Sequence, residues 1–443
     1  MRWRPLASVS EEVRDMDEKI QCAKELIYKF KGDTYAFGMG VLDQAGPLTA
    51  QFGKRAMLVS RPASRWLKPA INRLVTALKA NGIEILGPVQ GARPNAPRED
   101  VYRLHGHILH KRPEVIVSFE SGSGIDACKA AATLATYGDR EAELDPYFGV
   151  GEVTKQARRA GRTLLPLVAV MTAASSAAHL TKYANITDPV SGQKKLIVDE
   201  AIVPPRAVFD YGLTFTQPKS LTLDGGMDGL SHCLEVYLGA KGEKEDQIEI
   251  ICLLGIELVI DGLRRLTENP HDTVGREAVA LATDLGGYAI MVGGTNGPHL
   301  NSFSLVKYLS HGRACALMNP YYTVFFAPAV EARIRKVGEI LRKHGYVGSD
   351  LDALNSQELG RAVAEGMLVF NRSIGFPTAL SEIPGLGKDV LRRIIEAAKN
   401  PQLESKLLNM PVPLTPALVD KYMGSILEAA WSGDLDKILT LKN

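Results

Sequence analysis

Uninterrupted apolar runs, separated by amphipathic segments, most restrict how this 443-residue chain can fold. The runs are "RAMLVS" (55–60), "IEIL" (83–86), "EVIVSF" (114–119) and "LLPLVAV" (164–170), with segments of helical spacing between them. Strands of this kind are typical of a parallel sheet that is covered by helices on both faces. The first half of the chain is therefore predicted to be an α/β domain.

From about residue 215 the pattern changes. The stretches 244–266, 274–291, 328–345, 356–373 and 414–431 carry 3.6-residue periodicity, and strand-like runs become scarce. We therefore predict an N-terminal helical extension over 1–34, an α/β domain over 35–213 and an all-helical domain over 214–443. In the extension, Ser8 and Glu11 have the spacing of a capping box, and Gly32 is expected to end the helix.

Composition excludes several classes of function. The 52 basic and 50 acidic residues are interleaved and leave a net charge of +2, which argues against a nucleic-acid partner. The five cysteines include no CxxC pair, which favours a reduced, intracellular protein. The run "LLPLVAVMTAASSAA" falls short of the ~20 apolar residues of a membrane span, and the N-terminus lacks a signal-peptide pattern. We expect a cytoplasmic protein without a membrane partner.

A glycine-rich turn follows the apolar run at 114–119. In "SFESGSGIDACK", Gly122, Ser123 and Gly124 would place backbone N–H groups at the start of a helix, where the helix dipole favours an anion. One interpretation is a cradle for the pyrophosphate of a dinucleotide. The other is a tight strand-to-helix turn that needs glycine only for its backbone conformation. The sequence alone leaves both open.

A second run of small residues, "MTAASSAAHLT" (171–181), follows the apolar run at 164–170. The carboxyl edge of a parallel sheet is where ligands bind in such folds. Thr172, Ser176 and Thr181 could therefore donate hydroxyl groups to a phosphate, a ribose or a nicotinamide amide. Packing of a helix through small side chains is the alternative.

Asp228 and His232 in "DGGMDGLSHCLEVY" lie four residues apart, which places them on one face of a helix. Two further histidines, His299 and His311, follow near helix-boundary signals. One carboxylate and three imidazoles suit Fe²⁺ or Zn²⁺ with a position open for a substrate oxygen. Hydrogen-bonded core histidines are the alternative. The H-x-H-x-x-H cluster formed by residues 105, 107 and 110 is instead interpreted as a solvated helix surface.

Taken in this order, these segments resemble the iron-containing (group III) alcohol dehydrogenase family from about residue 35 to 435. "FGMGVL" (37–42) is similar to the family's opening strand, "RPNAPRED" (93–100) to its Pro-Asn-Pro-Thr loop, and "ESGSGIDACK" to its glycine-rich cradle. "MTAASSAAHLTKYANITDPVSGQKK" resembles the segment that follows the next strand. "GMDGLSHCLEVY" and "HGRACALMNP" resemble the family's metal-binding segments.

The resemblance implies a dinucleotide-binding α/β domain followed by an all-helical metal-binding domain, an architecture shared with dehydroquinate synthase. It implies hydride transfer between NAD(P)(H) and an alcohol or aldehyde, with iron or zinc, in a homodimer or larger homo-oligomer. The metal ligands would be Asp228, His232, His299 and His311. The pyrophosphate would lie at Gly122 and Ser123, with Asn95, Thr172, Thr181 and Lys194 at further cofactor contacts.

The segments at 120–121 and 175–179 and the residue at 303 depart from the family pattern. Glu120 places a carboxylate beside the expected pyrophosphate, so it must point away or be paired. His179 stands where the family has a glutamate. Phe303 replaces a second histidine, which leaves the group that moves the alcohol proton unidentified and indicates a more apolar pocket for a bulkier or more hydrophobic substrate.

Arg61 follows the first strand of the α/β domain, where members that prefer NAD place an aspartate. An acid there accepts a ribose hydroxyl, whereas arginine can pair with a 2′-phosphate. We therefore expect NADP(H) to be favoured over NAD(H).

Two rival functions stay open. One is a non-catalytic metal- and dinucleotide-binding protein. The other is an enzyme on the same scaffold that acts on a polyol or a sugar-derived substrate. Enzymes of this scaffold with anionic substrates use more basic residues, and between 228 and 320 we identify only Lys307 and Arg313 as candidates.

Overall fold

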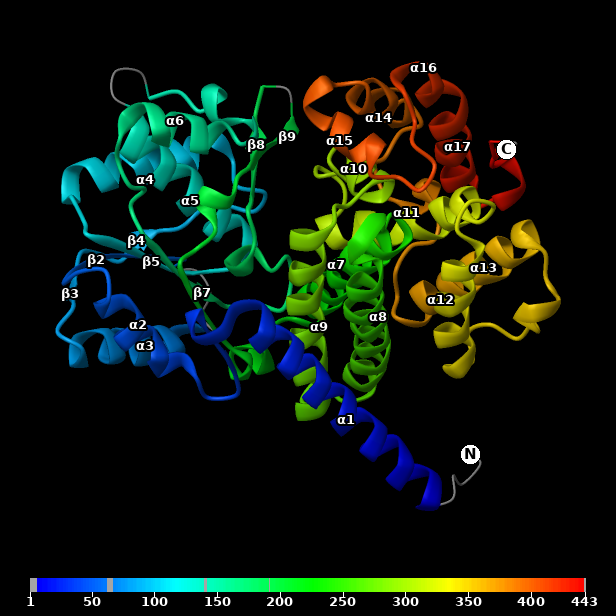
Figure 1. Ribbon diagram of the computed structural model, residues 1–443, viewed down its shortest axis with the longest axis horizontal. Coiled ribbons are helices and arrows are strands. Elements are labelled where there is room, and N and C mark those ends of the chain that lie inside the picture. Colours follow the sequence, from blue (N-terminus) through cyan, green and yellow to red (C-terminus); the bar gives the residue numbers. More distant parts are fainter. Residues whose placement is uncertain (1–5, 62–66, 139–141, 191, 442–443) are drawn as a thin grey trace.

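The computed structural model describes residues 6–61, 67–138, 142–190 and 192–441, and has an α/β half and a helical half that lie side by side (Figure 1). The sheet order is β1-β10-β7-β5-β2-β3, with β4 also paired to β2, and all of these pairs are parallel. The strands are β1 (Tyr35–Gly38), β2 (Arg55–Ser60), β3 (Glu84–Ile85), β4 (Val89–Gln90), β5 (Val115–Glu120), β7 (Leu167–Met171) and β10 (Arg206–Asp210).

Helices cover both faces of this sheet, as predicted (Figure 1). They are α2 (Ala45–Ala50), α3 (Lys68–Ala80), α4 (Arg98–Lys111), α5 (Gly122–Tyr137) and α6 (Glu152–Ala160). Alternate residues of β2 enter different cores: Ala56 and Leu58 pack in the cluster on the α2–α3 side, and Met57 and Val59 in the larger cluster. Because the strand is buried on both faces, its sequence shows an unbroken apolar run instead of alternation.

A small second sheet was not predicted. Its order is β6-β9-β8, formed by β6 (Gly149–Val150), β8 (Tyr183–Asp188) and β9 (Gln193–Val198), with β8 and β9 antiparallel. Thr187 pairs with Lys194 across this hairpin. The hairpin lies at the edge of the α/β half that faces the helical half (Figure 1).

The helical half begins with α7 (Lys219–Leu238), and most side chains of this helix are buried. It packs against α8 (Glu245–Glu268), α9 (Thr273–Val292) and α11 (His311–Phe326). The remaining helices are α10 (Gly297–Ser302), α12 (Glu331–Lys343), α13 (Ser356–Ser373), α14 (Val390–Ala398), α15 (Glu404–Leu408), α16 (Pro416–Leu418) and α17 (Gly424–Ser432). Within the described residues, none of the helices combines the length and apolarity that crossing a membrane requires.

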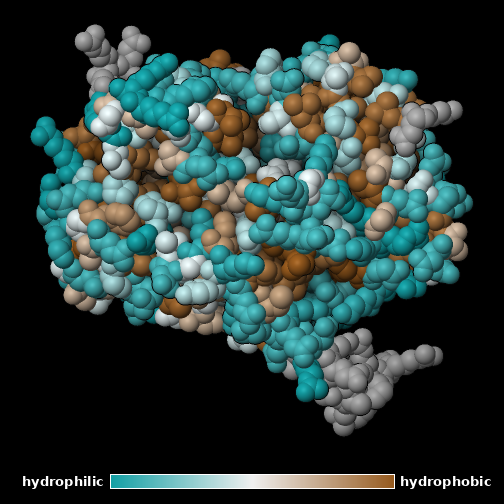
Figure 2. All heavy atoms as spheres, in the orientation of Figure 1, coloured by the Kyte–Doolittle hydropathy of each residue, from teal (hydrophilic) through white to brown (hydrophobic). Residues whose placement is uncertain are grey.

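The N-terminal helix α1 (Leu6–Lys31) packs on α9 and α8 through Met16, Ile20, Ala23 and Ile27. It begins before Ser8, so the predicted capping box at that residue is wrong, although the helix does end just before Gly32. The opening strand likewise begins at Tyr35 and ends at Gly38, ahead of the "FGMGVL" segment expected for it. Figure 2 shows hydrophobic and hydrophilic residues interspersed over one face of the molecule.

Candidate metal centre and cofactor cleft

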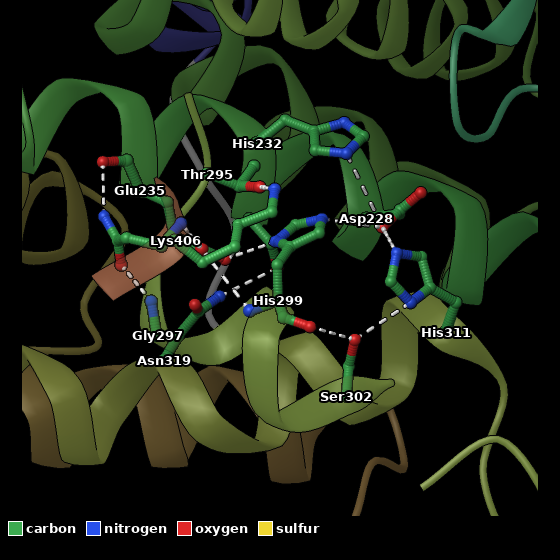
Figure 3. A network of polar contacts seen from close by, with 12 residues as sticks. Asp228, His232, Glu235, Thr295, Gly297, His299, Ser302, His311, Asn319 and Lys406 are labelled. Carbon is green, nitrogen blue, oxygen red and sulfur yellow. Dashed lines mark hydrogen bonds and ion pairs between the residues drawn. The ribbon is translucent and has the colours of Figure 1, made fainter. Parts of the chain in front are cut away.

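Four side chains from three helices converge in the helical half (Figure 3). Asp228 and His232 project from α7, His299 from α10, and His311 is the first residue of α11. The Nε2 atoms of His232, His299 and His311 lie 4.0, 3.7 and 3.8 Å from Asp228 Oδ1. Asp228 is therefore the centre of the cluster, and the four residues singled out in the sequence do lie together.

Two of the converging atoms have no hydrogen-bond partner among the described residues: the buried Asp228 Oδ1 and His299 Nε2. An unpaired buried polar atom is costly, so each such atom needs an explanation. Metal–ligand bonds of ~2.0–2.2 Å place two ligands of one ion roughly 3–4 Å apart. The observed separations are too long for hydrogen bonds and close to that range, so the donor set fits a divalent cation.

Hydrogen bonds fix the orientation of two of the imidazoles (Figure 3). His299 Nδ1 lies 2.5 Å from Glu235 Oε1. The Ser302 hydroxyl donates to the carbonyl oxygen of His299 and lies 3.0 Å from His311 Nδ1, from which it can accept. With protons held on both Nδ1 atoms, the Nε2 atoms keep their lone pairs, as a metal ligand requires.

Burial sets the protonation of these groups. It lowers the pKa of the three imidazoles well below their ordinary value, which leaves them neutral. It raises the pKa of Asp228 to about 7, and the charge of Lys194 acts in the opposite direction. A divalent cation beside Asp228 would favour the carboxylate further, since an opposite charge stabilises the ionised form.

Cys315 lies one turn after His311 on α11 and was not predicted as a candidate ligand. Cys315, Asp228, His299 and His311 each offer one ligand atom, and these four atoms lie within 4.8 Å of one another. His232 does not belong to this tighter group. Burial raises the pKa of the Cys315 thiol well above its ordinary value, and the acidic neighbours Asp228 and Glu235 raise it further. A bound cation would stabilise the thiolate as it stabilises the Asp228 carboxylate, so the pKa of the unliganded thiol does not choose between Cys315 and His232 as the fourth donor.

The cluster of candidate metal ligands formed by Asp228, His232, His299 and His311 (the metal cluster) lines a cavity of about 350 Å³ between the two halves. The wall also includes seven of the eight residues predicted to contact a cofactor, namely Arg61, Asn95, Gly122, Ser123, Ser176, Thr181 and Lys194. Thr172 is the eighth and does not line the cavity; its backbone N–H donates to the carbonyl oxygen of Glu120. The sequence signals at 120–124 and 171–181 thus meet at one cleft, as expected at the carboxyl edge of a parallel sheet.

The glycine-rich turn holds its shape through specific contacts. A Cβ on Gly122 would lie only 2.2 Å from Ser176 Oγ, so a larger residue does not fit there without a shift. The Ser123 hydroxyl accepts a hydrogen bond from the backbone N–H of Asn95, which itself adopts a positive φ of 65°. The buried Ser176 Oγ has no partner among the described residues and faces the same cleft. This turn begins α5, a helix of 16 residues whose N-terminus favours an anion.

Glu120 does not place an anion in the cleft. Its carboxyl group packs against Gly91 and Gly124, where an added Cβ would lie 1.7 and 2.4 Å from its oxygens. Burial raises its pKa to about 8, although the charges of Arg61 and Arg103 act in the opposite direction. The carboxyl group is therefore buried beneath the turn and neutral at pH 7, which meets the requirement that it point away from a pyrophosphate.

His179, the other unusual residue of this region, also lies outside the cavity wall. Its Nε2 lies 2.9 Å from Tyr35 Oη, and Asp284 Oδ2 accepts hydrogen bonds from Tyr35 and Tyr211. Asp284 belongs to α9 of the helical half, while the other three residues belong to the α/β half. His179 therefore belongs to a polar cluster that joins the two halves, and it does not line the cofactor cleft.

Sequence reasoning missed several residues of the wall, among them Asp126, Asp224, Thr295 and Lys406. The expectation that basic residues are lacking in the pocket was incomplete, because Lys406 enters from a helix far outside the segment 228–320. Of the two basic residues noted there, Arg313 is paired with Asp224 at 2.9 Å. The interpretation of the histidine cluster on α4 was wrong in part, since residue 105 is buried and only residue 110 is exposed.

Comparison with known proteins assigns both halves to the same group of enzymes. Residues 33–211 match the model of the family "Iron-containing alcohol dehydrogenase", and residues 222–416 match "Fe-containing alcohol dehydrogenase family, C-terminal". The chain belongs to the iron-containing alcohol dehydrogenase family. The gap between the two matched segments, residues 212–221, runs from just after the last strand of the large sheet into the first turn of α7.

Its curated relatives are distant. An NAD-dependent methanol dehydrogenase of Bacillus methanolicus is 25% identical over 355 residues, covering 80% of this chain and 88% of the relative. An NADPH-dependent butanol dehydrogenase of Clostridium saccharobutylicum is 26% identical over 350 residues, covering 78% of this chain and 84% of the relative. An alcohol dehydrogenase from Oenococcus oeni shares the fold with a TM-score of 0.76, 22% identity and coverage of 90% of this chain and 98% of that one.

These relatives confirm the fold and the family inferred from the sequence. The protein is an oxidoreductase of the alcohol dehydrogenase class, with a candidate site for a divalent metal in its helical half. Relatives of both cofactor types are present, so the family alone does not choose between NAD and NADP.

Proposed function

We propose that this chain transfers a hydride between NADP(H) and an alcohol or aldehyde at the cleft between its two halves. The observation that carries the proposal is the convergence of three imidazole Nε2 atoms on the unpaired Asp228 Oδ1, in the wall of the cavity that also contains the start of α5. The family match supports the reaction class.

Asp228, His232, His299 and His311 are the proposed metal ligands. A divalent metal held there supplies a Lewis acid toward the substrate oxygen. Glu235 and Ser302 act on the imidazoles themselves: each keeps a proton on Nδ1 of its partner, so that Nε2 faces the site. The neutral, buried imidazoles then present lone pairs to the metal without losing a proton when it binds.

The proposed cofactor contacts hold the dinucleotide along the other wall. The backbone N–H groups at Gly122 and Ser123 face the pyrophosphate, aided by the N-terminus of α5. Thr181 and Ser176 lie further along the same wall, and Lys194 comes from the β9 strand close to Asp228. The nicotinamide carries the hydride chemistry, and the protein supplies its position and the surrounding field.

The preference for NADP(H) rests on Arg61. This residue lines the cavity directly after β2, on the side of the glycine-rich turn, and the sequence has no Asp or Glu between Arg61 and Glu84. A guanidinium group can form paired hydrogen bonds with a 2′-phosphate, which an aspartate at this position would repel. Iron is the metal expected from the family, with zinc as the alternative that suits the same ligands.

The experiment that tests the ligand set is replacement of the metal by Co²⁺, followed by absorption spectroscopy of wild type, His232→Ala and Cys315→Ser. We expect the wild-type spectrum to lack a thiolate-to-cobalt charge-transfer band and Cys315→Ser to retain the metal. His232→Ala is expected to bind it at least about 10-fold more weakly. A charge-transfer band that Cys315→Ser abolishes would replace His232 by Cys315 in the ligand set.

A homodimer and a cytoplasmic location are also proposed, on the strength of the family resemblance and the composition. Light scattering of the purified protein measures the first, and fractionation of the producing cells measures the second.

A further inference from the structure

Lys406 is a buried cation in the wall of the catalytic cavity. It belongs to the short helix α15 and is only 7% exposed. Its Nζ donates to Thr295 Oγ1 and lies 5.9 Å from the centre of the Tyr183 ring. In Figure 3 the Lys406 side chain runs beside His299, one of the proposed metal ligands. The cavity therefore contains an ammonium group close to its metal cluster.

The charge of Lys406 has no direct counterion. Within the described part of the chain, no carboxylate oxygen lies within 4.0 Å of its Nζ. The acidic group that acts on it is Glu235, whose oxygens already accept from His299 Nδ1 and from the backbone N–H of Asn296. Burial lowers the pKa of Lys406, and Glu235 acts in the opposite direction. An ammonium group that is removed from water without a close counterion is costly to keep.

Lys194, the other lysine of the wall, has a different environment. The carboxylates that act on it are those of Asp228 and Asp126, which lie on the metal side and the cofactor side of the cavity. It also has a proposed role at the cofactor. Lys406 has no proposed role at the cofactor, and the acidic group that acts on it, Glu235, already accepts hydrogen bonds from His299 and Asn296, so the charge of Lys406 is not used by any element of the proposed reaction.

Apolar side chains line part of the cavity wall near Lys406. Tyr183, Leu196 and Ile290 line the same cavity, and the Tyr183 hydroxyl is occupied by a hydrogen bond to the carbonyl oxygen of Ile290. Thr295 supplies the hydroxyl group beside the ammonium. The ammonium group of Lys406 and the hydroxyl group of Thr295 stand beside these apolar side chains and form a site for a small oxyanion, because such pockets orient a ligand through a few placed polar groups.

We propose that Lys406, together with Thr295, binds an anionic group of the substrate, so that the enzyme acts on an aldehyde or alcohol with a carboxylate or similar small oxyanion away from its reacting carbon. The inference rests on the proposed function, since the metal cluster fixes where the reacting oxygen lies. It modifies the expectation of a bulkier or more hydrophobic substrate: Phe303, which stacks on His311 with ring centres 6.0 Å apart, is then one apolar wall of a pocket that has a charged end.

The test compares succinic semialdehyde with its methyl ester, which has a similar chain without the charge. Iron-loaded wild type, Lys406→Met, Lys406→Arg and the control Lys388→Met are assayed with NADPH. Lys388 is a suitable control because it is half-exposed and pairs with Glu428 at the surface. We expect Lys406→Met to lower kcat/KM for the semialdehyde by about 10–100-fold and that for the ester by less than about 3-fold. Lys406→Arg is expected to recover part of the loss, and Lys388→Met to change neither value.

An equal fall for both substrates in Lys406→Met would mean that this lysine only balances the buried Glu235, and the proposal would be overturned. A wild-type preference for the ester would overturn it as well. Calorimetry gives a readout without turnover: 4-hydroxybutyrate is expected to bind the metal-loaded wild type more tightly than butane-1,4-diol, and Lys406→Met to remove the difference. Absence of turnover with both aldehydes would contradict the proposed function, while calorimetry would still decide for or against the anion site.

Discussion

His179 Nε2 lies 3.2 Å from Asp284 Oδ1, and this contact joins the loop after β7 to helix α9 across the boundary between the two halves. Both side chains are almost fully buried, at 1% and 0% exposure. Tyr35 and Tyr211 donate to the other oxygen of the same carboxyl group. Asp284 thus accepts from both tyrosines and belongs to a polar cluster that joins the two halves.

Replacing Asp284 by alanine is predicted to destabilise the protein strongly. Two buried hydroxyl groups would lose their acceptor and the buried His179 would lose the carboxyl group beside it, which costs on the order of 3 kcal/mol or more of unfolding free energy. The exposed Asp352, whose side chain is 85% accessible, provides the matched control, and Asp352→Ala is expected to change stability by less than about 0.5 kcal/mol. Denaturant titration measures both, and similar values for the two variants would refute a structural role for the cluster.

Glu120→Gln is predicted to change how stability depends on pH. The folded-state pKa of Glu120 is raised to about 8, above the ordinary value of 4.5, so folding favours its protonated form. That stabilisation is complete below pH 4.5 and is lost as the pH rises through about 8. The variant cannot ionise at this position. Its free energy of unfolding should therefore exceed that of wild type at pH 9 by on the order of 3 kcal/mol, with little difference at pH 5.

Unfolding curves at both pH values test this prediction, with Glu99→Gln as the control because its side chain is 56% exposed. The difference between variant and wild type is the quantity to follow, since all other ionisable groups are common to both proteins. A Glu120→Gln variant that is no more stable than wild type at pH 9 would show that this carboxyl group is solvated or paired.

Arg61→Asp is predicted to reverse the cofactor preference. The substitution exchanges a partner of the 2′-phosphate for a group that repels it and accepts a ribose hydroxyl. We expect the ratio of kcat/KM for NADPH to that for NADH to fall at least about 10-fold. Lys68→Asp, an exposed charge reversal at the start of α3, should leave the ratio unchanged. An unaltered ratio in Arg61→Asp would make this residue an ordinary surface arginine.

Glu235→Gln is predicted to weaken metal binding without removing a ligand. Glu235 accepts from His299 Nδ1 and thereby fixes the ring and its tautomer. Loss of such an outer partner typically lowers metal affinity by about 10–100-fold. Competition with a chelator measures the affinity, and Glu243→Gln, on an exposed turn, is the control. Equal affinity in wild type and Glu235→Gln would show that His299 needs no such support.

Local patterns in the sequence predicted elements well and distant contacts poorly. The run at 55–60 coincides with β2, and the periodic stretch at 356–373 coincides with α13, because burial on two faces or on one stripe imposes a pattern that is visible in a few residues. The hairpin formed by β8 and β9 was not predicted, because its strands are half-exposed and interrupted by polar residues. Strand β3 retains only two of the four residues expected for it.

The candidate site shows the same division. Asp228 and His232 are recognisable from their spacing on one helix, and His299 and His311 from their places near helix-boundary signals, to which the family resemblance added the role of ligand. Lys406 carries no such signal: it lies in an ordinary helical segment some 95 residues after His311 in the chain, and only the fold brings it to the cavity. The role of His179 could not be predicted from the sequence either, because its partner Asp284 belongs to the other half of the molecule.

Elemental analysis of anaerobically purified protein, wild type beside Asp228→Ala, tests the central claim most directly when NADPH-linked reduction of an aldehyde series is measured on the same samples. Asp352→Ala serves as the control. The account predicts about one iron or zinc ion per chain in wild type and control, lost together with turnover in Asp228→Ala. Metal without turnover across the series would indicate a non-catalytic binding protein. Absence of metal from the wild type as well would contradict the account, because the three imidazoles around Asp228 would then be no more than a packed core.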